Sequence, residues 1–113
     1  MCIFCKIASK EIPSTVVYEN DDVICINDLK PATPVHVLII PKKHFDDILD
    51  LSTSKEGMEA MTSVLKAIPE VVRITGLEKG FRLINNCREQ GGQTVMHVHF
   101  HLIGGVRLGE KMI

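Results

Sequence analysis

The sequence predicts an α+β fold with helices on one face of a five-stranded antiparallel sheet. Five short runs of apolar and β-branched residues are separated by polar or glycine-bearing segments. Residues 54–75 repeat apolar side chains at helical spacing. Short connections between most of these segments favour antiparallel neighbours. The length of 113 residues favours a single domain, 1–113, that is large enough to bury a core.

The first half of the chain is expected to hold a short helix and three strands. Residues 3–9 suit one or two helical turns, which Pro13 ends. Asn20-Asp21-Asp22 is a good tight-turn sequence between the first two strands. Pro41 ends the third strand, which follows a polar connection with two prolines. The three strands are predicted at residues 16–19, 23–26 and 36–41.

The second half is expected to hold the main helix and two strands. Ser54 can cap this helix, and Pro69 inside it is expected to kink or split it. The segment LEKG ends the helix, with Gly80 as the turn residue. The remaining elements are predicted as a short helix at 45–51, a strand at 81–86, a glycine-bearing loop at 88–93 and a last strand at 94–105.

Composition excludes several classes of protein. The formal net charge is −1 with both signs mixed along the chain, so we expect no nucleic-acid partner. No run approaches the ~20 apolar residues of a membrane span. The first ten residues lack the order of a signal peptide, so we expect a cytoplasmic protein with reduced cysteines. Cys25 and Cys87 lie in strand-like runs and are expected to be small core residues.

The segment HVHFHLI, residues 97–103, places three of the five histidines at alternate positions. On a strand, His97, His99 and His101 would share one face, with neighbours roughly 7 Å apart. Val98, Phe100 and Leu102 would then face the core. A polar outer face of an edge strand would explain the row without a function. Three histidines in this register nevertheless favour a functional site.

Two chemistries suit this histidine row. A zinc hydrolase would use neutral imidazoles as ligands, but no carboxylate lies beside the row in sequence to act as a base. Alternatively, one imidazole attacks phosphorus while a neighbouring ring stabilises charge and supplies a proton. Gly91-Gly92-Gln93-Thr94 precedes the row and offers backbone and side-chain donors for an anion, which favours phosphate chemistry.

The pattern of His97-Val98-His99-Phe100-His101-Leu102-Ile103 resembles the signature of the histidine triad family of nucleotide hydrolases and transferases. The resemblance extends to the small nucleotide-binding branch of that family through KIASKEIPS, INDLKPATPVHVLIIPKKH, INN and GGQTVMHVHFHLIGG. It implies a two-fold homodimer with a joined sheet. It also implies a site for AMP or GMP and cleavage of phosphoramidate, acyl or related derivatives at the α-phosphorus.

The resemblance also implies a role for each matching residue. His99 would be the nucleophile, and His101 would contact the α-phosphate. His97 and His36 would complete the polar surround, and Asp28 would bind the ribose hydroxyls. The base would be flanked by Leu29, Ile26 and Phe4 or Ile7. The phosphate and leaving group would be held by Asn86, Gly92, Gln93 and Thr94.

Cys2 and Cys5 form a C-x-x-C pair that by itself is a poor signal. The family resemblance implies a structural zinc ion held by Cys2, Cys5, His44 of the PKKH segment and His97. No cofactor is expected for the chemistry itself. The rival functions are a dinucleoside polyphosphate hydrolase, a nucleotide-binding scaffold without essential catalysis, and the zinc hydrolase above.

Overall fold

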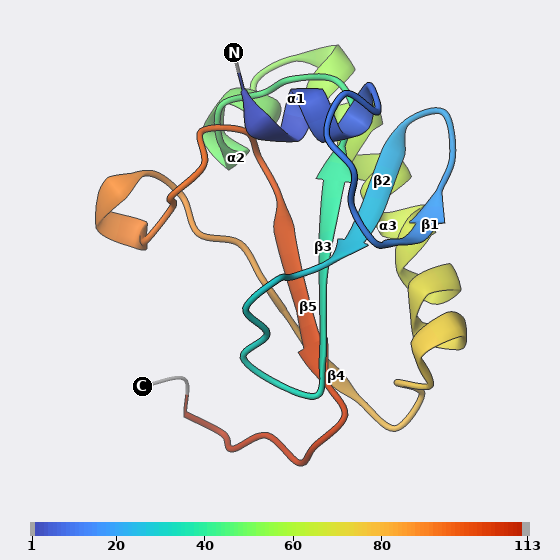
Figure 1. The fold of residues 1–113 in the computed structure, drawn as a ribbon. Coiled ribbons are helices and arrows are strands. Elements are labelled where there is room, and N and C mark those ends of the chain that lie inside the picture. Colours follow the sequence, from blue (N-terminus) through green and yellow to red (C-terminus); the bar gives the residue numbers. More distant parts are fainter. Residues whose placement is uncertain (1, 112–113) are drawn as a thin grey trace.

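A computed structural model describes residues 2–111 and contains one five-stranded antiparallel sheet (Figure 1). The strands follow the order β1-β2-β3-β5-β4 across the sheet, so β1 and β4 are its edges. This confirms the predicted class. The strands are β1 (Val16–Glu19), β2 (Val23–Asn27), β3 (Val35–Pro41), β4 (Phe81–Ile84) and β5 (Phe100–Gly104). The helices are α1 (Ile3–Ala8), α2 (Ile48–Leu51), α3 (Lys55–Thr75) and the single 3₁₀ turn η1 (Glu89–Gly91).

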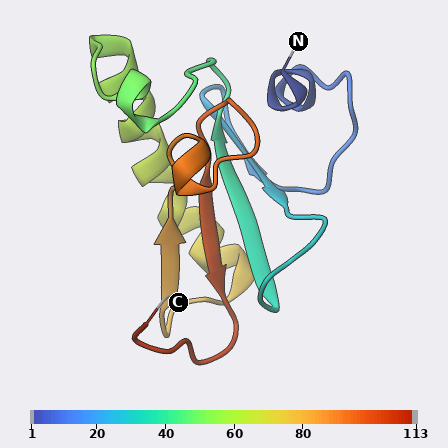
Figure 2. The same ribbon diagram turned by 90° about the vertical axis from the view of Figure 1, so that its left-hand side faces the viewer.

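The sheet is covered on both faces, which corrects the expectation that all helices share one face (Figure 2). Alternate side chains of β2 point in opposite directions. Val23 and Cys25 belong to the larger core under α3, whereas Ile24 and Ile26 belong to a smaller apolar cluster under α1. The short N-terminal helix lies opposite α3 because it buries two apolar side chains of its own on that face.

Strand β5 begins at Phe100, later than the predicted start at residue 94. His97 and His99 therefore lie in an irregular segment before the strand, with His97 in a bend. The alternation predicted for the row persists, because Val98, Phe100 and Leu102 all belong to the core under α3. In the register of β3 and β5, Leu38 faces His101 and His36 faces Ile103. This pairing brings His36 and His101 onto the same face of the sheet.

Helix α3 runs without a break from Lys55 to Thr75, so of the two expected effects of Pro69, a kink or a split, the split does not occur. The Ser54 side chain accepts a hydrogen bond from the Gly57 backbone, as its capping role predicts. The helix ends at Gly76, whose φ of 74° lies in the left-handed region, rather than at the LEKG segment. No helix within residues 2–111 is both long enough and apolar enough to cross a membrane.

The two cysteines expected in the core differ in burial. Cys25 lies on β2 and is fully buried, which confirms the expectation, and burial raises the pKa of its thiol to about 12. Cys87 follows the end of β4 and is only half-buried, so the expectation is wrong for this residue. The β4 strand stops at Ile84, before the chain reaches Cys87.

A close approach of α2 and α3 gives a prediction about stability. A Cβ atom at Gly57 would overlap the backbone carbonyl of Leu51, so Gly57→Ala must move one helix relative to the other. We expect a loss of about 2–3 kcal/mol in the free energy of unfolding, measured by urea titration. Glu59→Ala, on the exposed side of the same helix, should change it by less than about 0.5 kcal/mol. Equal midpoints for the two variants would contradict the prediction.

Candidate active site and metal centre

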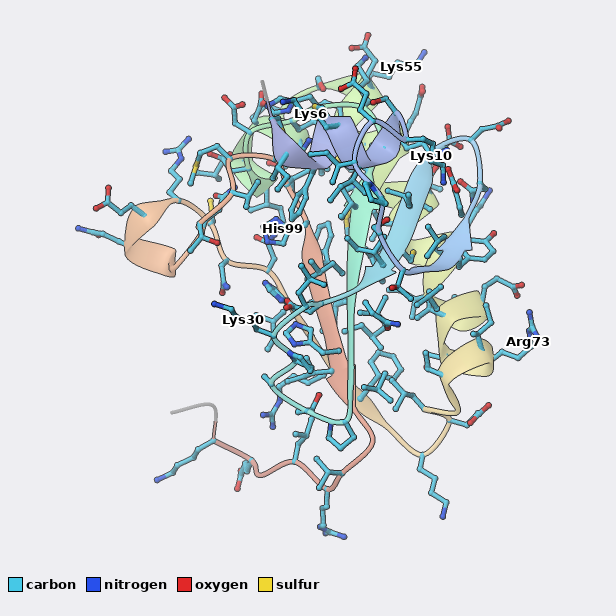
Figure 3. All side chains as sticks on the ribbon, viewed as in Figure 1. Lys6, Lys10, Lys30, Lys55, Arg73 and His99 are labelled. Carbon is cyan, nitrogen blue, oxygen red and sulfur yellow. The ribbon has the colours of Figure 1, made fainter. Side chains whose placement is uncertain are left out.

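The central histidine of the row, His99, is held in one tautomer by the backbone. Its Nδ1 atom lies 2.8 Å from the carbonyl oxygen of His97, which can only accept a hydrogen bond. Nδ1 therefore carries the proton, and the lone pair lies on Nε2. The ring is 6% exposed and lies under α1, beside the start of β5 (Figure 3).

Burial lowers the pKa of His99, and the same cause lowers the pKa of His101. The positive forms of His99 and His36 lower the pKa of His101 further. Both rings are therefore more fully neutral at pH 7 than a free histidine would be. An unprotonated ring is the form that a nucleophile requires.

A chain of hydrogen bonds also sets the tautomer of His101. The backbone N–H of Ala32 donates to Nδ1 of His36 at 3.0 Å, so the His36 proton lies on Nε2. This Nε2–H donates to Nδ1 of His101 at 2.9 Å. The remaining proton of His101 therefore lies on its own Nε2, where it can donate to a phosphate oxygen or a leaving group. A carboxylate oxygen of Asp28 lies 3.4 Å from His36 Nε2.

Four possible metal ligands lie together at the N-terminal end of α1, with one ligand atom from each within 4.8 Å of the others. They are Cys2, Cys5, His44 and His97. His97 donates from Nε2 to the carbonyl oxygen of Pro41 at 2.7 Å, and His44 donates from Nε2 to Asp46 at 2.7 Å. The Nδ1 lone pairs of both rings consequently point into the cluster, 3.2 Å apart. Two lone pairs that face each other at this distance suit a bound cation between them.

The distances in this Cys2His2 cluster fit zinc. Tetrahedral zinc with Zn–N of ~2.0–2.1 Å and Zn–S of ~2.3 Å places neighbouring ligand atoms about 3.3–3.8 Å apart. Sγ of Cys2 lies 3.3 Å from His97 Nδ1, and Sγ of Cys5 lies 3.5 Å from that nitrogen and 3.3 Å from His44 Nδ1. Four protein ligands leave no open position, which is typical of a structural site.

A second group, Asp28, His36 and His101, is also close enough to suggest a metal site. Its hydrogen bonds argue against one. His36 would have to ligate through Nε2 and carry its proton on Nδ1, where it would meet the Ala32 N–H donor. The proximity of these three residues is instead explained by the hydrogen bonds between the two rings and the nearby carboxylate.

The side chain of Gln93, expected at the phosphate, forms hydrogen bonds within the protein. Its side chain is 5% exposed and all of its hydrogen bonds are internal. The amide nitrogen donates to the carbonyl oxygens of Asp46 and Val95, and the amide oxygen accepts from the Arg88 backbone N–H. Gln93 therefore holds the loop 88–95 against the segment after His44, because its amide nitrogen donates to both segments.

Arg88 stabilises the same loop. Its Nε donates to the buried carboxylate of Asp47 at 2.9 Å, and this contact with Arg88 is the main reason that the pKa of Asp47 is lowered. The backbone of Arg88 has φ of 62°, which is strained for any residue except glycine. The Gln93 and Asp47 contacts hold it in this conformation.

The remaining predicted residues differ in where the structure places them. Phe4, Ile7 and Ile26 belong to the apolar cluster under α1, and the Phe4 ring packs edge-on against His99 at 4.9 Å between centroids. Leu29 is 96% exposed and does not belong to this cluster, so the structure does not bring it to the expected apolar wall. Gly92 and Thr94 are exposed, and Asn86 is half-buried beside the Gly91–Gly92 turn.

Three residues of the site do not stand out in the sequence. Asn85 donates from its side chain to the His99 carbonyl at 3.0 Å and so holds the backbone of the row. Asp46 and Asp47 support His44 and Arg88 respectively. The INN segment was a usable signal for Asn85. No local sequence pattern predicted a role for the two aspartates. Their partners include Arg88 and Gln93, which are distant in the sequence.

A cavity of about 720 Å³ lies away from the row, at the start of β4 and the end of β5. It is lined by residues 76–77, 79–82 and 105–108, and none of the predicted site residues lines it. The hydrogen-bonded histidines and the metal cluster, rather than cavity size, therefore define the candidate site.

The fold and the site define a class: a small α+β protein with a row of alternating histidines, whose central ring has a free Nε2, beside a Cys2His2 cluster. The model of the HIT domain matches residues 9–108. This chain belongs to the HIT domain family, and the predicted resemblance to histidine triad proteins is confirmed.

Three similar proteins bear on function. The purine nucleoside phosphoramidase of Escherichia coli (strain K12) is 40% identical over 97% of this chain and 92% of its own length. A 14 kDa zinc-binding protein of Brassica juncea is 46% identical over 91% of both chains. The solved structure of a HIT family hydrolase from Clostridium thermocellum has a TM-score of 0.92 and 46% identity, covering 99% of this chain and 96% of that one. These likenesses support a hydrolase of the HIT family.

Proposed function

We propose that this protein hydrolyses purine nucleoside phosphoramidates or related adenylates at the α-phosphorus, through a covalent intermediate on His99. The observation that carries the proposal is the geometry of His99. Nδ1 of His99 carries the ring proton and donates it in a hydrogen bond to the His97 carbonyl. This leaves a lone pair on Nε2 of a buried ring whose lowered pKa favours the neutral form. The name of the Escherichia coli relative supports the substrate class.

The proposed reaction has two steps. Nε2 of His99 attacks the α-phosphorus and forms a phosphorus–nitrogen bond, while the bond from phosphorus to the leaving amine breaks. The amine leaves with a proton, which His101 is placed to supply from Nε2. Water then attacks the same phosphorus and gives a proton back to Nε2 of His101. The phosphorus–nitrogen bond breaks, which releases the nucleoside monophosphate and returns the lone pair to His99.

Nucleotide binding is proposed on the α1 face of the sheet. Phe4, Ile7 and Ile26 would offer apolar surface to a purine, and the exposed Leu29 would flank the base from the loop after β2. Asp28 continues the same side of β2 and offers carboxylate oxygens to ribose hydroxyls. The exposed Gly92 and Thr94, with Asn86 beside the turn, would face the phosphate.

A structural zinc ion is proposed at Cys2, Cys5, His44 and His97. When bound, the ion would supply a cross-link between α1, the end of β3 and the histidine row. His97 has both ring nitrogens committed, to the cluster and to Pro41, so its proposed role is that of a ligand rather than a phosphate contact. No metal is required for the proposed chemistry at phosphorus.

A homodimer is proposed through the β4 edge. This strand pairs only with β5 among the described strands, and it exposes Phe81 at 40% and Leu83 at 38%. Unpaired edges with apolar side chains favour pairing with another strand. An antiparallel contact between two β4 strands would join two sheets across a two-fold axis.

A substrate panel tests the proposed activity. Adenosine 5′-phosphoramidate should be hydrolysed to AMP with kcat/KM at least about 100-fold above that for diadenosine polyphosphates, measured by chromatography of the released AMP. The reverse preference would favour the dinucleoside polyphosphate hydrolase. AMP binding without turnover of either substrate would favour the nucleotide-binding scaffold.

A further inference from the structure

We infer that the metal cluster and the nucleotide site reinforce each other, with Phe4 as the positioning residue between them. The inference rests on the proposed function and extends it: zinc would raise nucleotide affinity, and nucleotide would raise zinc affinity. Three links connect the sites, through helix α1, the Phe4 ring and the backbone of His97.

The first link is helix α1 itself, which has only six residues. An isolated helix of this length is unstable in water, so its position depends on its tertiary contacts. Cys2 and Cys5 turn toward the cluster, while Phe4 and Ile7 turn into the apolar cluster under the helix. One short helix and its N-cap residue Cys2 therefore supply two of the four metal ligands and two side chains of the proposed base wall.

The second link is the ring of Phe4. It lies between the two cysteines in sequence and packs edge-on against both His97 and His99, at centroid distances of 5.9 Å and 4.9 Å. Rotation of the His99 ring would carry Nε2 away from a bound phosphorus atom. Phe4 blocks part of that rotation, and its own position follows the helix to which the metal ligands belong.

The third link is His97. Its Nδ1 points into the cluster, while its backbone carbonyl accepts the hydrogen bond that sets the tautomer of His99. A shift of His97 after metal loss would move this acceptor. The residue that completes the metal centre thus also orients the proposed nucleophile.

Coupling of this kind is reciprocal, because each ligand must change the affinity for the other by the same factor. A purine packed on Phe4 and Ile7 would hold α1 in place and so retain both cysteine ligands. We expect saturating AMP to raise zinc affinity about tenfold, within the range typical of coupled sites. The same factor should separate the AMP affinities of the zinc-loaded and zinc-depleted proteins.

The test is competition for zinc between the zinc-loaded protein and a coloured chelator, with and without saturating AMP. A roughly tenfold shift in zinc affinity supports the inference, and an unchanged affinity overturns it while leaving the proposed activity intact. Absence of AMP binding, measured separately by calorimetry, would overturn both. The readout is metal affinity and needs no turnover.

Phe4→Leu separates this coupling from general stabilisation of the fold. Leucine keeps apolar volume but loses the ring edge that contacts His99, so the effect of AMP on zinc affinity should fall at least about threefold. Leu65→Val, at an exposed position of α3 on the opposite face of the sheet from α1, is the control and should keep the full coupling. Full coupling in both variants would show that Phe4 does not carry it.

Discussion

The His99→Asn variant should lose at least about 10⁴-fold in kcat and still bind AMP, because the nucleophile is removed while the local hydrogen bond can be kept. The amide nitrogen of asparagine can donate to the His97 carbonyl, as Nδ1 of His99 does. No atom of asparagine replaces the Nε2 lone pair. The measurements are AMP release from adenosine 5′-phosphoramidate and AMP affinity by calorimetry.

His101→Asn is the comparison for this result. It removes the proposed proton donor but keeps the nucleophile, so its loss in kcat should be smaller, roughly 10²–10³-fold. Retention of kcat within tenfold of the wild type by His99→Asn would contradict the assignment of the nucleophile. A loss of folding would be visible as a changed melting temperature and would be separated from a loss of chemistry by the AMP titration.

The second large effect is expected from the metal cluster. Cys5→Ser removes a thiolate ligand that lies 3.3 Å from His44 Nδ1 and 3.5 Å from His97 Nδ1. Loss of a structural zinc ion should lower the free energy of unfolding by about 3 kcal/mol or more, and the melting temperature by roughly 10 °C. Elemental analysis and thermal melts of freshly purified protein measure both consequences.

Cys87→Ser is the matched control, because Cys87 is a half-buried cysteine outside the cluster. It should keep full zinc content and change the melting temperature by only a few degrees. Zinc-free wild-type protein with an unchanged melting temperature would contradict the metal centre. Chelation also distinguishes a zinc hydrolase, which would lose activity at once, from a structural site, where activity falls only as the protein loosens.

Local sequence patterns predicted most of the elements because their causes are local. The apolar spacing and Ser54 cap predicted α3, and Asn20 forms the expected turn by accepting from two backbone N–H groups through its side chain. Pro69 was expected to kink or split the helix; it does not split α3, since burial of one face of the helix outweighs one lost backbone donor. The late start of β5 was also missed, because Gln93 and Asn85 hold the preceding segment.

The histidine row, the C-x-x-C pair and the PKKH histidine are all visible in the linear sequence. The family resemblance supplied their expected roles. Sequence could not show that Gln93 is buried and internally bonded, or that Leu29 is exposed, because both facts depend on contacts between segments far apart in the chain.

The order of amino acids alone thus determined which rings alternate with core residues, since the two faces of an extended chain follow from its period of two. Only the tertiary structure decided which nitrogen of each ring carries a proton. The carbonyls of Pro41 and His97 and the N–H of Ala32 impose those tautomers, and folding alone aims these backbone groups at the rings. The direction of the Nε2 lone pair of His99 depends on these contacts, which exist only in the folded chain.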